Sequence, residues 1–108
     1  MKEVKAFIHR NRIADVVHAL KAAGFRNISV IDVRGMLKAL DSQEQQYSIE
    51  IGEKVITEVK LELVCAADQV DQAVALIRDN GRTGQPIAGW VYVSEIETAY
   101  PIEDGNAS

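Results

Sequence analysis

The segment Gly81–Trp90, with the sequence GRTGQPIAGW, holds the residues of this chain best suited to binding an anion. Glycines leave the backbone free to turn, and amide N–H groups exposed at such a turn can donate hydrogen bonds to an anionic group. The glycine spacing matches neither a Walker nor a Rossmann motif, so an ordinary connection between a helix and a strand is the other interpretation. The order of the elements around this segment favours the anion-binding interpretation.

Catalytic chemistry has little support in this sequence. We find no nucleophile with a neighbouring base and no pair of carboxylates at a defined site, and His9 and His18, the only histidines, are expected at a surface or an interface. Cys65 is the only cysteine, which excludes an internal disulfide and a thiolate cluster, and its apolar neighbours predict a buried core residue. We therefore predict no enzyme and no metal site, although symmetry could bring copies of His9 together in an oligomer.

Hydrophobic periodicity predicts six elements that would position the glycine-rich segment. Residues 3–9 alternate in polarity as a strand does, and residues 13–20 have the apolar spacing of a helix that ends at Gly24. Further strands are predicted at 28–34, 55–65 and 90–96. A second helix repeats the helical spacing from Val70 to Ile77, and Asp68 can cap it.

The order βαββαβ predicts an α+β fold, a ferredoxin-like sandwich with a four-stranded antiparallel sheet and both helices on one face. A chain of 108 residues fits a single domain, 1–108. The other face of the sheet would carry Phe7, Ile31, Val64 and Tyr92, which are too apolar for the surface of a small monomer. Packing against neighbouring subunits would cover them.

Charge and hydropathy exclude several classes of partner. A net charge of −4 lacks the basic surface on which nucleic-acid binding relies, and there is no polybasic cluster for an anionic membrane. The longest apolar run is only a few residues and the start of the chain is charged, so we expect neither membrane insertion nor a signal peptide. The expected location is cytoplasmic.

A long polar connection, residues 36–54, separates the second and third predicted strands. A hairpin needs only about two to five residues, so a connection of this length is typical of a functional loop or of a solvated excursion. Its centre carries Asp41 and Glu44, and Tyr47 could serve as an anchor inserted into a partner. Residues 98–108 form a small, polar C-terminal tail that is expected to fray.

The chain resembles the PII signalling proteins over nearly its whole length, both in the order of its elements and in the residues at many positions. The matching residues are the opening Met1-Lys2, Asp15-Val16, Ala19-Leu20, Gly24, Val30, Val33, Gly35, the strand Val59–Val64, Val70-Asp71, Arg82-Thr83-Gly84, Gly89 and Val93. The resemblance implies a ferredoxin-like homotrimer that binds adenine nucleotides, often with 2-oxoglutarate, in clefts between subunits. It also implies that the long loop docks onto transporters, enzymes or transcription regulators.

The resemblance further implies the residues that would hold a ligand. Ser29, Glu62 and Val64 stand where the family lines the adenine, and Thr83, Gly84 and Gly89 match its phosphate turn. Arg82 is the best replacement cation, with Lys38 and Arg34 in reserve, although it could also simply complement the helix dipole. Trp90 is either a stacking platform for a base or part of a subunit interface. The candidate ligand-binding set is Ser29, Gly35, Lys38, Glu62, Val64, Arg82, Thr83, Gly84, Gly89 and Trp90.

Departures from the family pattern indicate a smaller ligand than ATP. Trp90 replaces a lysine that contacts phosphates in the family, and Pro101 and Glu103 replace two arginines. Each charge-assisted hydrogen bond to phosphate contributes about 1.5 to 3 kcal/mol, so their loss disfavours a triphosphate. The family's Gly-Phe-Gly-Arg at the start of the loop is here Gly35-Met36-Leu37-Lys38, which also disfavours 2-oxoglutarate with a metal-bound triphosphate. Ile51 occupies the position of the family's modified tyrosine, so uridylylation does not carry over.

We therefore predict a trimeric regulatory protein that senses AMP, ADP or a cyclic nucleotide in clefts between subunits. Ligand occupancy would set the conformation of the 36–54 loop, where Asp41, Glu44 and Tyr47 would contact a membrane transporter or a cytoplasmic enzyme. The alternative is a trimer that has lost nucleotide sensing and acts as a constitutive adaptor or a metal-responsive module.

Overall fold

The computed structural model describes residues 1–32, 58–86 and 88–103. Strand β1 (Lys2–His9) is followed by a short 3₁₀ turn, η1 (Arg10–Arg12), and helix α1 (Ile13–Ala22). Strands β2 (Ile28–Ile31) and β3 (Glu58–Cys65) come next, then η3 (Ala67–Gln69), helix α4 (Val70–Asn80) and strand β4 (Gly89–Glu95). The predicted order of strands and helices is confirmed over these residues.

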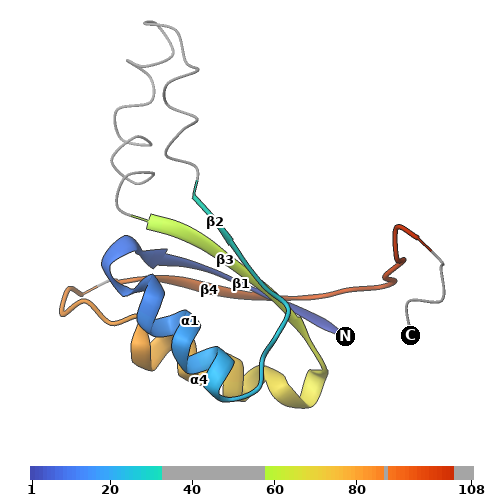
Figure 1. The fold of residues 1–108 in the computed structure, drawn as a ribbon. Coiled ribbons are helices and arrows are strands. Elements are labelled where there is room, and N and C mark those ends of the chain that lie inside the picture. Colours follow the sequence, from blue (N-terminus) through green and yellow to red (C-terminus); the bar gives the residue numbers. More distant parts are fainter. Residues whose placement is uncertain (33–57, 87, 104–108) are drawn as a thin grey trace, which may run out of the picture.

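The four strands form one antiparallel sheet in the order β2-β3-β1-β4. Figure 1 shows α1 and α4 side by side on one face of this sheet. The first strand lies in the interior of the sheet, between β3 and β4, and Lys2 is the partner of both Cys65 and Glu95. This arrangement is the predicted ferredoxin-like α+β fold.

The sheet and the helices enclose one apolar core. Val4, Ala6 and Ile8 alternate along β1 with more exposed residues, as expected for a strand with one buried face. The helices meet them with Val16, Leu20, Ala73 and Ile77, and β3 adds Leu61, Leu63 and Cys65. Cys65 is buried, as predicted, and burial raises the pKa of its thiol. The core residues thus fix which face of each strand is turned away from the helices.

The N-terminus of α4 differs from the prediction. The sequence predicts Asp68 as a cap of the second helix, but Asp68 lies inside η3, two residues before α4 begins at Val70. The chain turns there through Gln69, whose side-chain oxygen Oε1 accepts a hydrogen bond from the Ala66 amide at 3.1 Å. The Gln69 amide donates in return to the Ala66 carbonyl at 3.0 Å. A glutamine that closes this turn locally makes the aspartate cap unnecessary.

The strand boundaries also differ in detail. Strand β2 spans Ile28–Ile31 of the strand predicted at 28–34, and β4 begins one residue earlier than predicted, at Gly89. The described part of the third strand begins at Glu58. The long connection at 36–54 and the last five residues lie outside the described residues.

The face of the sheet opposite the helices is rich in exposed apolar side chains. Val64 is 40 % exposed, Tyr92 52 % and Trp90 60 %, and Ile31 is also exposed. The rings of Phe7 and Tyr92 meet edge to face, with their centroids 6.2 Å apart. The predicted outer face is therefore confirmed within the single chain, and nothing in that chain covers it among the described residues.

Beyond β4, the chain leaves the sheet. The Ile96 amide donates to the Met1 carbonyl at 3.1 Å, and the residues that follow run away from the domain in Figure 1. Tyr100 and Ile102 are fully or almost fully exposed in this segment, and Pro101 and Glu103 are also exposed. None of the described helices is both long and apolar enough to cross a membrane.

Candidate ligand-binding site

A hollow of about 390 Å³ lies between the end of α4 and the start of β4, and we call it the turn hollow. Its wall is the glycine-rich segment that the sequence analysis singled out, residues 81–86 with 88–90. Phe7 and Ile8 of β1, Ile77 and Arg78 of α4, and Val91 of β4 complete the lining. Five predicted ligand residues therefore share one hollow: Arg82, Thr83, Gly84, Gly89 and Trp90.

The backbone of this segment leaves amide donors available. The Gly81 amide donates to the Ile77 carbonyl at 2.8 Å, and the Thr83 hydroxyl accepts from the Gln85 amide at 3.3 Å. Gly84 has a φ of +82°, in the left-handed region that glycine adopts at little cost. Among the described residues, the amides of Thr83 and Gly84 have no hydrogen-bond acceptor, so they can donate to an anion.

Gly89 sets how closely β4 approaches β1. It has a φ of +138°, and a Cβ at this position would lie 2.0 Å from the Phe7 carbonyl oxygen. No side chain fits there, which explains why glycine begins this strand. Trp90 follows directly on the outer face, opposite Phe7 in the strand register. The tryptophan borders the hollow and is exposed in the single chain, so it remains free to stack on a ligand or to meet another subunit.

Two arginines give the turn hollow its positive charge. Arg82 has a side chain 73 % exposed, and its Nη2 lies 3.5 Å from an Asp79 carboxylate oxygen. An ion pair so exposed is weak, and it leaves the guanidinium able to turn toward an anion. Arg78 lines the same hollow and was not predicted. The only signal in the sequence was its place in the last turn of α4, where a cation complements the helix dipole.

A second hollow, of about 430 Å³, lies at the opposite edge of the sheet, and we call it the edge hollow. Ser29 on β2 and Glu62 and Val64 on β3 line it, as do Glu3 and the unpredicted Arg26. These three predicted residues lie together because Ser29 pairs with Glu62 across the two strands.

Lysines hold the Glu62 carboxylate in place at the rim of the edge hollow. The Lys60 Nζ lies 3.3 Å from Glu62 Oε1, and the Lys5 Nζ lies 3.9 Å from the same oxygen. Lys5 also lies 3.7 Å from a carboxylate oxygen of Glu3. With two carboxylates and the Ser29 hydroxyl, the edge hollow suits a neutral group that donates hydrogen bonds better than it suits a phosphate.

The structure does not bring the two groups of predicted residues together in one chain. The linings of the two hollows share no residue. Strands β3 and β1 lie between Ser29 on β2 and Trp90 on β4, which places strands β2 and β4 about 14 Å apart at the usual strand spacing. The other predicted residues, Gly35 and Lys38 with the reserve cation Arg34, and Asp41, Glu44 and Tyr47 of the loop, lie outside the described residues.

The histidines do not form a catalytic or metal site in the described part of the chain. His9 ends β1, and its Nδ1 accepts a hydrogen bond from the Asn11 amide at 3.2 Å, while His18 is exposed on α1. Among residues 1–32, 58–86 and 88–103, no three His, Cys, Asp or Glu side chains are grouped to hold a metal ion. The site that does emerge is one for non-covalent binding.

The fold is that of a small ferredoxin-like α+β domain, and the geometry of its glycine turn suits an anionic ligand. The chain belongs to the nitrogen regulatory protein P-II family, whose pattern matches residues 1–106. It is 33 % identical over 105 residues to a nitrogen regulatory protein P-II of Rhodobacter capsulatus, covering 97 % of this chain and 94 % of the relative. It is 27 % identical over 105 residues to nitrogen regulatory protein P-II 1 of Methanothermobacter thermautotrophicus, covering 97 % and 91 %.

Family membership confirms the resemblance inferred from the residues. Identity reaches 30 % over 107 residues with the nitrogen regulatory protein P-II of Bradyrhizobium diazoefficiens, covering 99 % of this chain and 96 % of that protein. Because the match spans both hollows and the whole sheet, the chain is a PII-like regulatory signalling protein. The prediction that it is not an enzyme is thereby confirmed.

Proposed function

We propose that this chain acts as a homotrimer that binds a small adenine nucleotide in the clefts between its subunits. The observation that carries the proposal is the separation of the candidate residues into two chemically different hollows on opposite edges of one sheet. Identical subunits packed head to tail in a ring place one edge of each copy against the other edge of the next. The edge hollow of one subunit would then face the turn hollow of its neighbour.

The outer face supports assembly of this kind. Phe7, Tyr92, Trp90 and Val64 form an apolar surface that a small monomer would leave in water. Their burial between subunits adds stability at about 25 cal/mol for each Å² of apolar surface removed from water. Sedimentation equilibrium at micromolar concentration should give a mass near three times 11.9 kDa. A monomer at that concentration would leave no cleft between subunits and would rule out the proposal.

The chemistry of the hollows favours AMP, ADP or a cyclic nucleotide over Mg-ATP. In the turn hollow, Arg78, Arg82 and the Thr83 and Gly84 amides suit one or two phosphate groups. In the edge hollow, Ser29 and Glu62 suit the amino group of a base. Where the family has two further arginines, Pro101 and Glu103 stand in the exposed segment after β4, so they supply no cation to a third phosphate.

The regulatory output would pass through residues 36–54 to a membrane transporter or a cytoplasmic enzyme. Family membership supports this kind of partner, and we assign Asp41, Glu44 and Tyr47 to the contact. A ligand that favours one loop state by a few kcal/mol is sufficient to shift the population from one state to the other. We place the protein in the cytoplasm, without nucleic-acid binding and without direct insertion into a membrane.

Calorimetry with AMP, ADP, cyclic AMP and Mg-ATP tests the ligand assignment. We expect ADP or AMP to bind more tightly than Mg-ATP, and Arg82→Ala to weaken that binding about tenfold or more. Lys21→Ala is the matched control, because it removes an exposed cation, in the last turn of α1, that lines neither hollow. Tighter binding of Mg-ATP that is unaffected by Arg82→Ala would contradict the assignment. Absence of binding by any nucleotide would favour the nucleotide-independent adaptor or metal-responsive trimer.

A further inference from the structure

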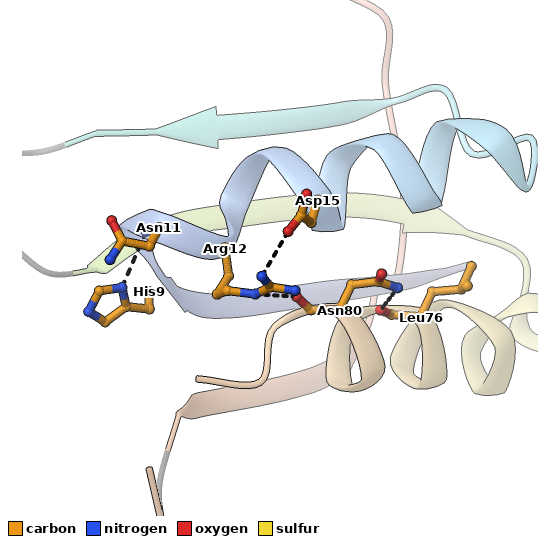
Figure 2. A network of polar contacts seen from close by, with 6 residues as sticks. All are labelled: His9, Asn11, Arg12, Asp15, Leu76 and Asn80. Atoms are coloured by element: carbon orange, nitrogen blue, oxygen red, sulfur yellow. Dashed lines mark hydrogen bonds and ion pairs between the residues drawn. The ribbon is translucent and has the colours of Figure 1, made fainter. Parts of the chain in front are cut away.

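Arg12 joins the start of α1 to the end of α4, although 68 positions separate it from its partner in the chain. It is the last residue of η1, and Figure 2 shows its side chain reaching toward Asn80, the last residue of α4. The Arg12 Nε donates a hydrogen bond to the Asn80 backbone carbonyl at 3.0 Å. The contact is partly buried, so water competes with it only in part.

The guanidinium is held from a second side. Arg12 Nη1 lies 2.9 Å from Asp15 Oδ2, one turn further along α1. Figure 2 shows the guanidinium between this carboxylate and the Asn80 carbonyl. Because the guanidinium is planar and its donors point in fixed directions, two acceptors on different sides orient it. The Arg12 side chain is therefore held in one orientation toward α4, unlike a surface cation without fixed partners.

The acceptor lies at a sensitive position, because the last carbonyls of a helix have no partner within the helix. A cation is favoured at this negative end of the helix dipole. Asn80 is itself fixed, since its side-chain Nδ2 donates to the Leu76 carbonyl at 2.8 Å. The Asn80 carbonyl belongs to the same planar peptide unit as the Gly81 amide, so a bond that orients the carbonyl also orients the next residue.

That next residue is the first of the turn hollow. Gly81 begins the wall that continues through Arg82, Thr83 and Gly84, while Arg12 itself is outside the lining. Gly81 also lies against α1, because a Cβ there would be 3.8 Å from Val16 Cγ2 and 2.8 Å from the Ile77 carbonyl oxygen. The direction in which the chain leaves α4 is thus set by contacts with α1, of which the Arg12 bond is the polar one.

We propose that Arg12 is a positioning residue for the turn hollow: by holding the Asn80 carbonyl, it fixes the amides of residues 81–85 in the arrangement that receives an anionic ligand. The ligand named in this inference rests on the proposed function, whereas the expected effect of Arg12 on the free protein does not depend on it. Removing the bond leaves the core intact and loosens the segment that follows α4. Loss of the bond should therefore lower the ligand affinity and speed the hydrogen exchange of these amides more than it lowers the global stability.

The test compares Arg12→Gln, Arg12→Lys and wild-type protein, with Lys21→Gln as the matched control. Lys21→Gln also removes one positive charge, from the last turn of α1, at the opposite end of this helix from Arg12. Hydrogen exchange of the amides of residues 81–85 is measured by mass spectrometry or NMR without ligand. ADP affinity is measured by calorimetry, and the melting temperature of each variant is recorded alongside.

We expect exchange at residues 81–85 about fivefold faster in Arg12→Gln, and ADP binding weaker by a similar factor, as for loss of one partly exposed charged hydrogen bond. Arg12→Lys keeps the charge but not the planar donors, so it should fall between Arg12→Gln and wild type. Lys21→Gln should match wild type in both measurements. If Arg12→Gln does not fold, the exchange and ADP affinity of Arg12→Lys, compared with wild-type protein, decide whether Arg12 positions the turn.

Three results would overturn the proposal. The first is unchanged exchange at residues 81–85 in both Arg12 variants. The second is faster exchange spread evenly over the whole chain, since that would mean a general stabilising role. The third is local loosening without any loss of ADP affinity. If wild-type protein binds no ADP, the proposed function fails, and exchange in the free protein alone then decides the positioning role.

Discussion

Replacing Gly89 by alanine tests the close contact that begins β4. A Cβ at this position would lie 2.0 Å from the Phe7 carbonyl oxygen, whereas real Cβ contacts stay at 3.0 Å or more. The obstacle is backbone, so a side-chain rotation cannot relieve it. The start of β4 would have to move about 1 Å away from β1, which disturbs the pairing of Gly89 with Ile8.

The expected cost combines two effects. Alanine at a φ of +138° is strained by about 1 to 3 kcal/mol. Loss of one or two strand hydrogen bonds adds about 0.5 to 1.5 kcal/mol each. We therefore expect Gly89→Ala to lower the free energy of unfolding by about 3 kcal/mol or more, a large part of the 5 to 15 kcal/mol typical of a domain.

Gly84→Ala is the matched control. Gly84 also has a positive φ, +82°, but a Cβ there would meet nothing within 4 Å. Its cost should be limited to the left-handed conformation, about 1 to 2 kcal/mol. Thermal unfolding followed by circular dichroism, at one fixed chain concentration, should show Gly89→Ala as the less stable variant by about 8 °C or more in melting temperature. Equal destabilisation of the two variants would refute the contact argument.

Three further predictions concern the core and the titrating groups. Leu61→Ala should lower the free energy of unfolding by about 2 to 5 kcal/mol in urea titrations, because Leu61 is fully buried, and a loss below 1 kcal/mol would contradict its place in the core. Burial, aided by the Asp68 carboxylate, raises the pKa of the Cys65 thiol, so alkylation at pH 8 should be much slower in native than in urea-unfolded protein; equal rates would show an accessible thiolate. A hydrogen bond and the charge of Lys2 lower the pKa of Glu95 below its usual 4.5, so this ion pair stabilises the fold above that pH and is lost as the pH falls through the lower folded pKa. An NMR titration should show the Glu95 midpoint rise in Lys2→Gln, and no change would mean that Lys2 is not the cause.

The elements were predictable because their signals are local. Val4, Ala6 and Ile8 alternate with polar residues over a distance that one strand covers, and Ile13, Val16 and Leu20 repeat within one helix. Asp68 failed as a cap because a competing local signal, the Gln69 side chain, closes the turn first. Both residues favour a helix start, and the choice between them depends on backbone geometry that sequence spacing does not record.

The site could be predicted only in part, for a different reason. The glycine segment is continuous in the chain, so Arg82, Thr83 and Gly84 were found together. Arg12 was missed because its partner is a backbone carbonyl at the end of another helix, and any residue has one. The separation of Ser29 from Trp90 follows from the strand order, which comes from the fold and not from either residue.

The interior position of β1 has a consequence for how the chain folds during its synthesis. Strand β1 is synthesised before the other three strands of the described sheet, and it needs β3 on one side and β4, the last of the four, on the other. Contacts between residues as distant in the chain as Lys2 and Glu95 raise the contact order, which slows folding. Until β4 is made, one edge of β1 has unpaired backbone groups open to other nascent chains. Chains that stop before Gly89 should therefore be prone to aggregate, and completion of the last strand closes that exposed edge.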